Sequence, residues 1–487
     1  MRLWIAVFLP NLPLDAARPH WSEQPALICG VLEQERVIAL TPAARAAGLR
    51  LGLRRAGALA LCPEATLLER DPAAEARTLQ AAALSLLQYT PQLAVPDGDS
   101  LLLDVGASLM VFGGPRALHR RVRATLAALD LRGGIAMAPT ARGASLLARG
   151  PARRRVLQAD TLARRLDALP LTLLPEAQAR LAWLQGLGCQ RLADLRRLPR
   201  AGLQRRSDPA LLHALDAAYG AAAEVHAWLS PPARFEARTE LMDYVEHADA
   251  LLHVSGRLTE QLSGWLGAQR LAVRAITLTL EHERGRHACP PSQLHLAMAE
   301  PVWQSAHLRG LLRERLARFE LAAPVIAVTL SAPVTVDMPA ASTTLFPEPG
   351  GSAADHARLL DLLSARLGPA QVRRPAPLAD HRPEAANQWL PVAADLPRPP
   401  ELPPALERPF WLIEPAQPLA LRAHRPVYQG QPLRLLRGPE RIESGWWDAV
   451  NTQRDYFVAE DAAGARYWLY RERGGETAHW FLHGRYA

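Results

Sequence analysis

The sequence predicts an α+β fold of several domains, and three observations support this. Short apolar runs alternate with helical patterns over the first 150 or so residues, and the pattern is then almost purely helical from about 160 to 228. A β-α-β-β-α-β order follows over 233–337. The last 42 residues, from Trp446, hold ten of the 28 aromatic side chains in short β-like runs. Strands that alternate with helices indicate a layer with a central sheet, and the aromatic tail indicates a small separate β module.

The first apolar run, residues 3–9, is interpreted as a buried opening strand. A signal peptide is the alternative, but Pro10, Asn11 and Pro13 interrupt the run and only one charge precedes it. No segment reaches the ~18 uninterrupted apolar residues of a membrane span. We therefore expect a soluble, cytoplasmic protein with no membrane partner.

The later elements of the first layer follow from the same patterns. An Ala/Arg/Leu helix pattern runs to about residue 55, and further helices are predicted over 75–90 and 115–129. Buried strands are predicted at 26–29, 37–40, 101–103 and 134–136.

The second half of the chain predicts a small α+β domain, a linker and the tail module. Strands are expected at 234–242, 273–280, 294–298 and 325–330, with helices near 247–266 and 305–319. Between Pro375 and Pro409 there are ten prolines in 35 residues, which favours a linker, partly of polyproline type, over a packed element.

The composition excludes several chemistries and favours a polyanionic partner. The chain has no lysine, so all 56 Lys+Arg residues are arginine, and neither a Schiff base nor a Walker-type phosphate loop is possible. Codon bias accounts for the missing lysine but not for the net charge of +8, which points first to nucleic acid. The four cysteines form no CxxC pair, which fits a reducing compartment. His282, His287 and Cys289 are interpreted as ordinary loop residues rather than a metal trio, because no fourth ligand is evident.

The segment 97–105, DGDSLLLDV, carries the strongest chemical signal and is followed by a Val-Phe-Gly-Gly turn at 111–114. Carboxylates at the entrance of a buried strand are ligands that Mg²⁺ takes together with substrate phosphates. An acidic turn with a strand-end Asp is the simpler alternative, and composition alone favours it.

These motifs resemble those of the Y-family (DinB/UmuC-like) translesion DNA polymerases, and most closely of their catalytically inactive ImuB-type relatives. The resemblance places Asp99 at the first metal-binding acid, Ser100 at the catalytic Glu and Asp104 at a structural Asp of the strand. Aligning the first strand places Phe8 at the acid that bridges both metals. Two of three metal carboxylates are thus missing, and a two-metal site depends on clustered anionic oxygens. We expect a vestigial site, no catalytic residue and no cofactor, with Mg²⁺ relevant only if residual activity exists.

The resemblance also implies a domain organisation. It divides the chain into a palm-like layer (1–20 and 75–160), fingers (21–74), a helix-hairpin-helix thumb (161–230), a little finger (233–340), a clamp-peptide and Pro-rich linker segment (341–408) and a C-terminal aromatic-rich module (409–487).

By the same resemblance, Arg45 and Arg149 match residues that contact the nucleotide phosphates. The pattern LQGLGCQRLADL at 184–195 resembles a helix-hairpin-helix, in which Gly186 and Gly188 allow a tight turn whose N–H groups face a DNA phosphate and Arg191 adds charge.

Partner segments are implied near the end of the chain. Leu345-Phe346 resembles the end of a sliding-clamp peptide, although Ser342 replaces its Gln. The tail around Trp446, Trp447 and Trp480 resembles the ImuB tail. That tail implies binding to an ImuA-type RecA-like protein and to the α subunit of an error-prone replicative-type polymerase. A self-contained β module whose aromatic residues all lie in the core is the alternative.

The sequence therefore predicts a non-catalytic scaffold of a damage-inducible (SOS) mutagenic translesion complex that binds primer–template DNA and the sliding clamp. One alternative is an active low-fidelity Y-family polymerase that uses Asp99 with a displaced acid, Asp15 or Asp97. Another is a DNA-binding repair protein that never meets the clamp.

Overall fold

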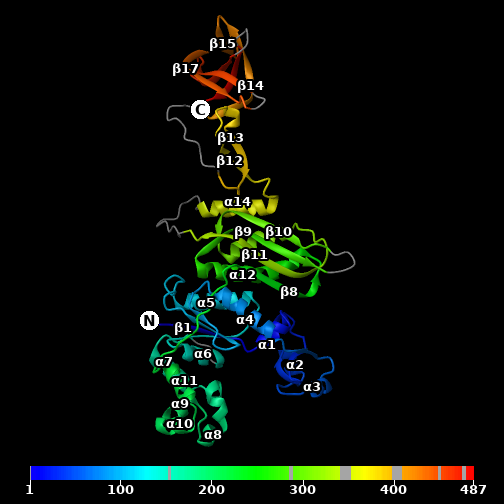
Figure 1. Cartoon of the computed structure of the whole chain (residues 1–487), viewed down its shortest axis with the longest axis vertical. Helices are drawn as coiled ribbons and strands as arrows, with labels where there is room; N and C mark the ends of the chain where they lie inside the picture. Colours follow the sequence, from blue (N-terminus) through cyan, green and yellow to red (C-terminus); the bar gives the residue numbers. More distant parts are fainter. Residues whose placement is uncertain are drawn as a thin grey trace. The chain divides into compact units, whose positions relative to one another are not determined.

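The computed structural model describes residues 2–151, 155–283, 289–339, 353–396, 408–447, 451–473 and 479–486. The chain divides into two compact units, Met1–Arg366 and Leu367–Ala487, which we describe separately (Figure 1). None of the helices in the described ranges combines the length and the apolar character needed to cross a bilayer.

The palm-like layer is a four-stranded antiparallel sheet in the order β5-β6-β1-β7. Its elements are β1 (Trp4–Phe8), β5 (Leu93–Ala94), β6 (Ser100–Asp104), β7 (Gly134–Ala138), α1 (Leu12–Ala17), α4 (Pro72–Leu86), α5 (Pro115–Ala128) and α6 (Ala141–Arg149). Alternate residues of β1 face opposite sides. Ile5 and Val7 pack with α4 and α5, whereas Trp4 and Ala6 pack with α6. The predicted opening strand is confirmed.

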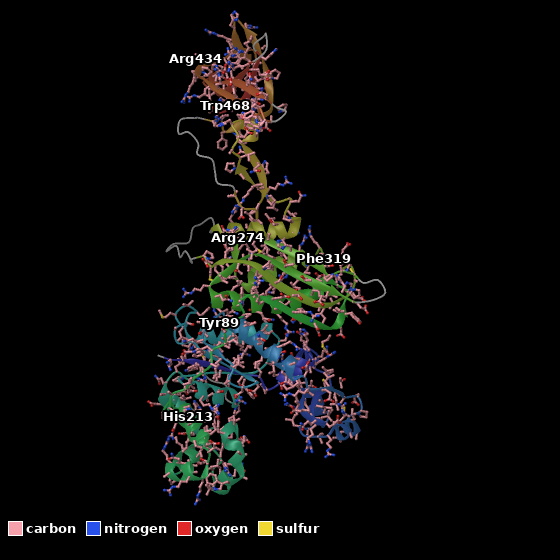
Figure 2. The ribbon with its side chains drawn as sticks, viewed as in Figure 1. Tyr89, His213, Arg274, Phe319, Arg434 and Trp468 are labelled. Atoms are coloured by element: carbon pink, nitrogen blue, oxygen red, sulfur yellow. The ribbon has the colours of Figure 1, made fainter. Side chains whose placement is uncertain are left out.

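Tyr89 shows how the loops of this layer are fixed (Figure 2). Its hydroxyl lies 2.8 Å from the Thr125 hydroxyl of α5, and its ring meets Phe112 edge-on at 5.3 Å. The Phe-Gly-Gly turn that follows the acidic segment is thereby anchored to the helical face of the sheet.

The fingers-like segment is a three-stranded sheet in the order β3-β2-β4. Its elements are η1 (Trp21–Glu23), β2 (Cys29–Glu33), β3 (Arg36–Leu40), α2 (Pro42–Ala46), α3 (Arg55–Leu61) and β4 (Thr66–Glu69). The single helix pattern predicted up to residue 55 is wrong, because α2 ends at Ala46. Gly48 and Gly52 have φ of 93° and 84°, a left-handed conformation that ends a helix and favours glycine.

The thumb-like segment is entirely helical up to Tyr219. It comprises α7 (Ala159–Asp167), η2 (Leu171–Leu173), η3 (Pro175–Arg180), α8 (Leu181–Gly186), α9 (Leu192–Arg197), α10 (Arg200–Arg206) and α11 (Pro209–Tyr219). Its buried leucines form one core with the α6 side of the palm-like sheet. The thumb-like segment therefore packs on the side of the palm-like sheet that Ala6 faces.

The little-finger-like domain has the predicted β-α-β-β-α-β order, with an antiparallel sheet β10-β9-β11-β8. Its elements are β8 (Glu236–Val245), η4 (Ala248–Ala250), α12 (Leu251–Gln269), β9 (Leu271–His282), β10 (Ser292–Val302), α13 (Ser305–Leu316) and β11 (Val325–Asp337). Helix α12 packs between this sheet and α4 of the palm-like layer (Figure 1). A Cβ on Gly264 would lie 1.8 Å from the Leu84 carbonyl oxygen, so α12 meets α4 backbone to backbone.

The described part of the segment 341–408, expected to be a clamp-peptide and Pro-rich linker, contains regular structure. Helix α14 (Ala353–Leu367) is fastened to the little-finger-like domain by Asp361, which accepts from the Ala299 N–H at 2.7 Å. Strands β12 (Arg373–Pro377) and β13 (Asn387–Pro391) form a two-stranded pair, with η5 (Pro383–Ala385) between them. The expectation of no packed element here is wrong, because an isolated pair of strands leaves outer edges where proline removes no ladder hydrogen bond.

The C-terminal module is a seven-stranded sheet in the order β16-β15-β14-β20-β19-β18-β17. Its strands are β14 (Trp411–Arg422), β15 (Arg425–Tyr428), β16 (Gln431–Pro432), β17 (Arg434–Ser444), β18 (Thr452–Glu460), β19 (Arg466–Glu472) and β20 (Trp480–Arg485). Trp468, labelled in Figure 2, stacks on Tyr456 with ring centres 4.1 Å apart. The prediction of an aromatic-rich β module is confirmed.

Candidate functional site

The ends of β1 and β6 bring together the three residues expected at a vestigial metal centre. Phe8 and Ser100 are direct partners in the antiparallel register of the two strands. The Leu9 N–H donates to the Asp99 carbonyl at 2.9 Å, which fixes Asp99 beside them. Ser100 is almost fully buried, whereas the Asp99 side chain is 39% exposed.

Arg149, the last residue of α6, reaches into this group of side chains. Its Nη2 donates to Asp99 Oδ1 at 2.8 Å, to Ser100 Oγ at 2.9 Å and to Asp97 Oδ2 at 3.2 Å. Its guanidinium carbon lies 4.3 Å from the centre of the Phe8 ring, a cation–π distance. The side chain is only 17% exposed, so water screens these contacts weakly.

A glycine on β7 makes this approach possible. Gly134 is the register partner of Phe8 on the other side of β1. A Cβ on Gly134 would lie 1.8 Å from the Ala148 carbonyl oxygen. Because glycine leaves that space free, the end of α6 packs directly on the strand and Arg149 lies over Phe8.

The residues of this site do not fit a two-metal centre. Such a centre needs anionic oxygens that bridge two cations. Phe8 offers no ligand atom, Ser100 offers a hydroxyl that already donates to Asp99 Oδ1 at 2.7 Å, and Arg149 pairs with both nearby carboxylates. The cation held at this position is a guanidinium of the chain itself.

Asp15 does not join this site. It is buried on α1, where Trp21 Nε1 donates to its Oδ1 at 2.8 Å and its Oδ2 has no hydrogen-bond partner among the described residues. Burial raises the pKa of Asp15 to about 7, against the opposing effect of the Trp21 hydrogen bond. The alternative of Asp15 as a displaced metal acid is therefore disfavoured, whereas Asp97 does lie beside Asp99.

Asp104 closes β6 as a structural residue. Its Oδ1 accepts from the Gly106 N–H at 3.1 Å, which caps the turn after the strand. This geometry agrees with the structural role expected for Asp104.

Residues 12–149 match the family model described as "impB/mucB/samB family". The matched segment spans the fingers-like segment and most of the palm-like layer. The chain is 28% identical to Protein ImuB of Caulobacter vibrioides (strain NA1000 / CB15N), over 90% of this chain and 100% of that protein. It is 31% identical to DNA polymerase IV of Yersinia pestis (strain Pestoides F), over 38% of this chain and 54% of that enzyme.

Among solved structures, one similar to this chain is an insertion ternary complex of Dbh DNA polymerase. The TM-score is 0.40 at 17% identity, covering 69% of this chain and 98% of that one. The expected resemblance to ImuB-type proteins is confirmed as sequence similarity, and the predicted fold class, an α+β fold of several domains with an added β-rich C-terminal domain, is confirmed.

Within the impB/mucB/samB segment, Arg45 is separate from Arg149. It is exposed on α2, whose first turn is capped by Thr41 through a hydrogen bond from the Ala44 N–H to Thr41 Oγ1 at 3.3 Å. Within the described part of the chain, the hydrogen bonds and the cation–π contact of Arg149 involve Asp97, Asp99, Ser100 and Phe8, and none involves Arg45. Nucleotide-phosphate contact by these two residues stays a prediction, and the charge of Arg149 is already paired.

Beyond that family segment, the hairpin at 184–195 has the geometry expected from its sequence. Helices α8 and α9 are joined by a turn in which Gly188 has φ of 84°. The N–H groups of Gln190 and Arg191 donate to Asp194 Oδ2 at 3.1 and 2.9 Å, and these bonds lower the pKa of Asp194. Asp194 therefore occupies backbone donors that a phosphate would use, and DNA binding through Gly186 and Gly188 stays a prediction.

Positive charge surrounds this hairpin. The exposed arginines of the thumb-like segment are Arg164, Arg165, Arg180, Arg191, Arg196, Arg197, Arg200, Arg205 and Arg206. Of these, Arg200 is paired with Asp216 and Arg196 with Asp167. The remaining guanidinium groups add positive charge to the exposed surface of the thumb-like segment.

The residues predicted to bind partner proteins differ in whether the structure describes them and in how exposed they are. Leu345 and Phe346 lie outside the described residues. Trp446 and Trp447 are 78% and 58% exposed, with rings edge to face at 5.4 Å. Trp480 is only 8% exposed and packs in the core of the sheet with Leu469 and Leu482. Its burial argues against a direct partner contact and favours the expectation that aromatic residues of the module are core residues.

Two features of the structure were not predicted from the sequence: the ion pair between Arg149 and Asp97, and a cluster of two histidines and an aspartate. The pairing of Arg149 with Asp97 joins residues 52 positions apart, and the only signal was a cation aligned with the phosphate-contacting position. His20, Asp130 and His253 also converge, with no signal in the sequence. By contrast, His282 is a satisfied core histidine, bonded to the Ala323 carbonyl at 2.8 Å and to Ser292 Oγ at 2.7 Å.

Proposed function

We propose that this protein is a non-catalytic scaffold of a damage-inducible mutagenic translesion synthesis complex, and its similarity to Protein ImuB over 90% of the chain supports this. The observation that supports this best is Arg149, which pairs with Asp97 and Asp99 and covers Phe8. With a guanidinium on its carboxylates, the site lacks the pair of metal ions that activates a primer 3′-hydroxyl and neutralises a departing pyrophosphate. The chain contributes binding surfaces instead of chemistry.

Primer extension tests the absence of catalysis. The purified full-length chain, with primer–template DNA, the four nucleotides and Mg²⁺ or Mn²⁺, is expected to give no extended product. Asp99→Ala should give the same result, and DNA polymerase IV serves as the positive control. Incorporation that Asp99→Ala abolishes would overturn the proposal.

An active polymerase with a rearranged acid pair is the second candidate. Asp97 and Asp99 accept hydrogen bonds from the same Arg149 nitrogen, so the two carboxylates lie close together. This candidate requires Arg149 to leave the site. The same extension assay with Arg149→Ala separates the two, since a masked enzyme gains activity on losing the guanidinium and a scaffold does not.

The scaffold role assigns the binding of DNA and the binding of the sliding clamp to different parts of the chain. Primer–template DNA binds through the arginine-rich thumb-like segment and the little-finger-like domain by phosphate contacts. The sliding clamp binds Leu345-Phe346, and tethering raises the effective concentration of a partner polymerase at the lesion. Pull-down of the clamp with Leu345→Ala and Phe346→Ala tests this, and unchanged capture would favour a repair protein that never meets the clamp.

The C-terminal module is assigned to the partner proteins, an ImuA-type RecA-like protein and the α subunit of an error-prone replicative-type polymerase. Exposed tryptophans are enriched where proteins dock, and Trp446 with Trp447 forms such a pair. Trp446→Ala and Trp447→Ala should each weaken capture of a partner at least tenfold. Trp389→Ala, at a side chain 65% exposed, is the matched control.

A further inference from the structure

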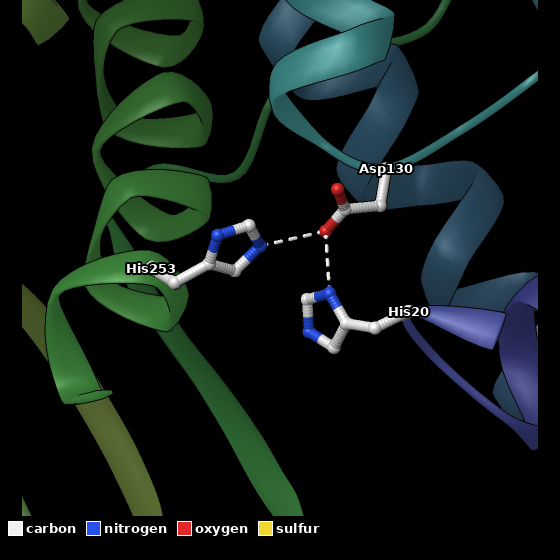
Figure 3. Close-up of side chains that lie close together, drawn as sticks. All are labelled: His20, Asp130 and His253. Atoms are coloured by element: carbon white, nitrogen blue, oxygen red, sulfur yellow. Dashed lines mark hydrogen bonds and ion pairs between the residues drawn. The ribbon is translucent and has the colours of Figure 1, made fainter. Parts of the chain in front are cut away.

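Three metal-ligating side chains meet where the little-finger-like domain packs on the palm-like layer (Figure 3). His20 lies just before η1, Asp130 lies in the turn after α5, and His253 lies on α12. His253 is 123 positions from Asp130. The cluster therefore joins two domains of the first unit.

The ligand atoms are already close to one another. Asp130 Oδ2 lies 3.0 Å from His20 Nδ1 and 2.7 Å from His253 Nε2, and one ligand atom from each of the three residues lies within 4.8 Å of the others. The two rings meet edge-on with centres 4.5 Å apart. In a tetrahedral zinc site with bonds near 2.0–2.1 Å, neighbouring ligand atoms are about 3.3 Å apart. Small rotations of these side chains are enough to admit an ion.

The donor set selects the kind of ion. Two imidazole nitrogens and one carboxylate oxygen suit Zn²⁺ and related divalent transition metals, whereas Mg²⁺ takes oxygen ligands. Side-chain exposures of 30% for His20, 16% for Asp130 and 46% for His253 leave a path for the ion and room for water as a fourth ligand.

The backbone holds two of the ligands in an unfavourable conformation. His20 and Asp130 have φ of 63° and 60°, in the left-handed region that costs a residue with a side chain roughly 1 kcal/mol or more. Both side chains contact His253 of α12. Strained residues of this kind cluster at ligand sites.

We propose that His20, Asp130 and His253 form a zinc-binding site that fastens α12 to the palm-like layer. The site lies apart from the Arg149 cluster and does not depend on the scaffold function. Without metal, Asp130 Oδ2 links the two imidazole rings in a hydrogen-bonded network. Zn²⁺ replaces the protons shared within that network.

Titration of Zn²⁺ alone into the untagged, EDTA-treated full-length chain at pH 7.5 tests the site by calorimetry. A Cys289→Ser background removes the one cysteine that is not buried. One ion per chain is expected, with affinity at least tenfold lower in His20→Ala, Asp130→Asn and His253→Ala. His356→Ala, at an exposed histidine of α14, should leave the affinity unchanged. Co²⁺ in place of Zn²⁺ should give visible absorption of a His/carboxylate site that His253→Ala removes.

A second readout separates a lost ligand from a lost fold. Circular dichroism confirms that each variant is folded, and His253→Ala removes a half-exposed side chain without opening the core. Zn²⁺ should slow proteolytic cleavage between α11 and β8 at least threefold in the unsubstituted chain and leave the rate unchanged in His253→Ala. Absence of stoichiometric binding, or binding that the three ligand substitutions do not weaken, would overturn the proposal and leave a hydrogen-bonded network.

Discussion

Arg149 covers Phe8, with its guanidinium carbon 4.3 Å from the ring centre, while the same guanidinium donates to Asp97 and Asp99. An aromatic ring thus stands where the resemblance to Y-family polymerases places a metal-binding carboxylate, and the cation aligned with a phosphate-contacting residue pairs with the nearby acids instead. A guanidinium would compete with metal ions at an intact acid cluster, and without the guanidinium the remaining carboxylates would repel one another.

Removal of Arg149 should destabilise the palm-like layer. Arg149→Ala removes three charge-assisted hydrogen bonds and leaves Asp97 and Asp99 uncompensated, so the free energy of unfolding should fall by about 2 kcal/mol. Arg149→Lys keeps the charge but loses the planar fork, and its loss should be intermediate. Urea denaturation measures both. Arg45→Ala, at an exposed arginine of α2, is the control and should change stability by less than about 0.5 kcal/mol.

Restoration of the carboxylates should create a divalent-ion site only when Arg149 is also removed. Phe8→Asp with Ser100→Glu adds two acids beside Asp99, and in the presence of Arg149 they should pair with the guanidinium. The triple variant that adds Arg149→Ala should bind Mn²⁺ at least tenfold more tightly than the double variant. Electron paramagnetic resonance of free Mn²⁺ measures the difference. Equal affinity in the two variants would show that Arg149 does not exclude metal.

The sequence predicted that Phe8, Ser100 and Arg149 match active-site positions of Y-family polymerases, but it did not predict how they interact. The apolar run of β1 predicted the strand that ends at Phe8, and the resemblance placed Phe8 and Ser100 at one metal site, but their pairing across β1 and β6 was not predicted. The contact with Arg149 depends on a close approach of α6 to Gly134, which no periodicity encodes. The β12–β13 pair escaped prediction for a related reason, because proline frequency reports local preference and not whether a sheet edge is open.

The Asp15 carboxyl should make stability fall as pH rises. Its pKa is about 7 in the folded state against an ordinary value of 3.8. Between these values the native state keeps a proton that the unfolded chain releases, so stability decreases with rising pH and the full cost is reached above pH 7. A pKa difference of about three corresponds to a loss of about 4 kcal/mol in the free energy of unfolding. Asp15→Asn should remove this slope and be more stable than the unsubstituted chain at pH 8.

Urea denaturation from pH 4 to pH 8 measures the Asp15 effect as the difference between the two proteins. Glu23→Gln, an exposed acid nearby in the sequence, provides the control and should leave the difference flat. A difference curve for Asp15→Asn with no pH dependence would mean that the buried carboxyl is not protonated at neutral pH.

The contact between α12 and α4 should depend on Gly264. Because a Cβ there would lie 1.8 Å from a backbone oxygen, Gly264→Ala forces the helices apart, and a loss of about 3 kcal/mol or more is expected. Gly310→Ala on α13 is the matched control, since a Cβ there meets nothing within 4 Å. That control should be neutral or stabilise the chain by up to about 1 kcal/mol. Urea denaturation, with proteolysis of the connection between α11 and β8, measures both variants.

DNA affinity should depend on salt and on the arginines beside the α8–α9 turn. Each phosphate contact contributes about 0.9 to the slope of log affinity against log salt, so Arg191→Ala or Arg197→Ala should lower that slope by about one and weaken binding at low salt several-fold. Fluorescence anisotropy with labelled primer–template DNA at several salt concentrations measures the slope. Arg422→Ala, at an exposed arginine of β14, should leave the slope unchanged. Asp194→Asn should strengthen binding, because it removes a negative charge from the backbone N–H groups of Gln190 and Arg191. A slope that none of the thumb-like substitutions changes would move the DNA contact to another part of the chain.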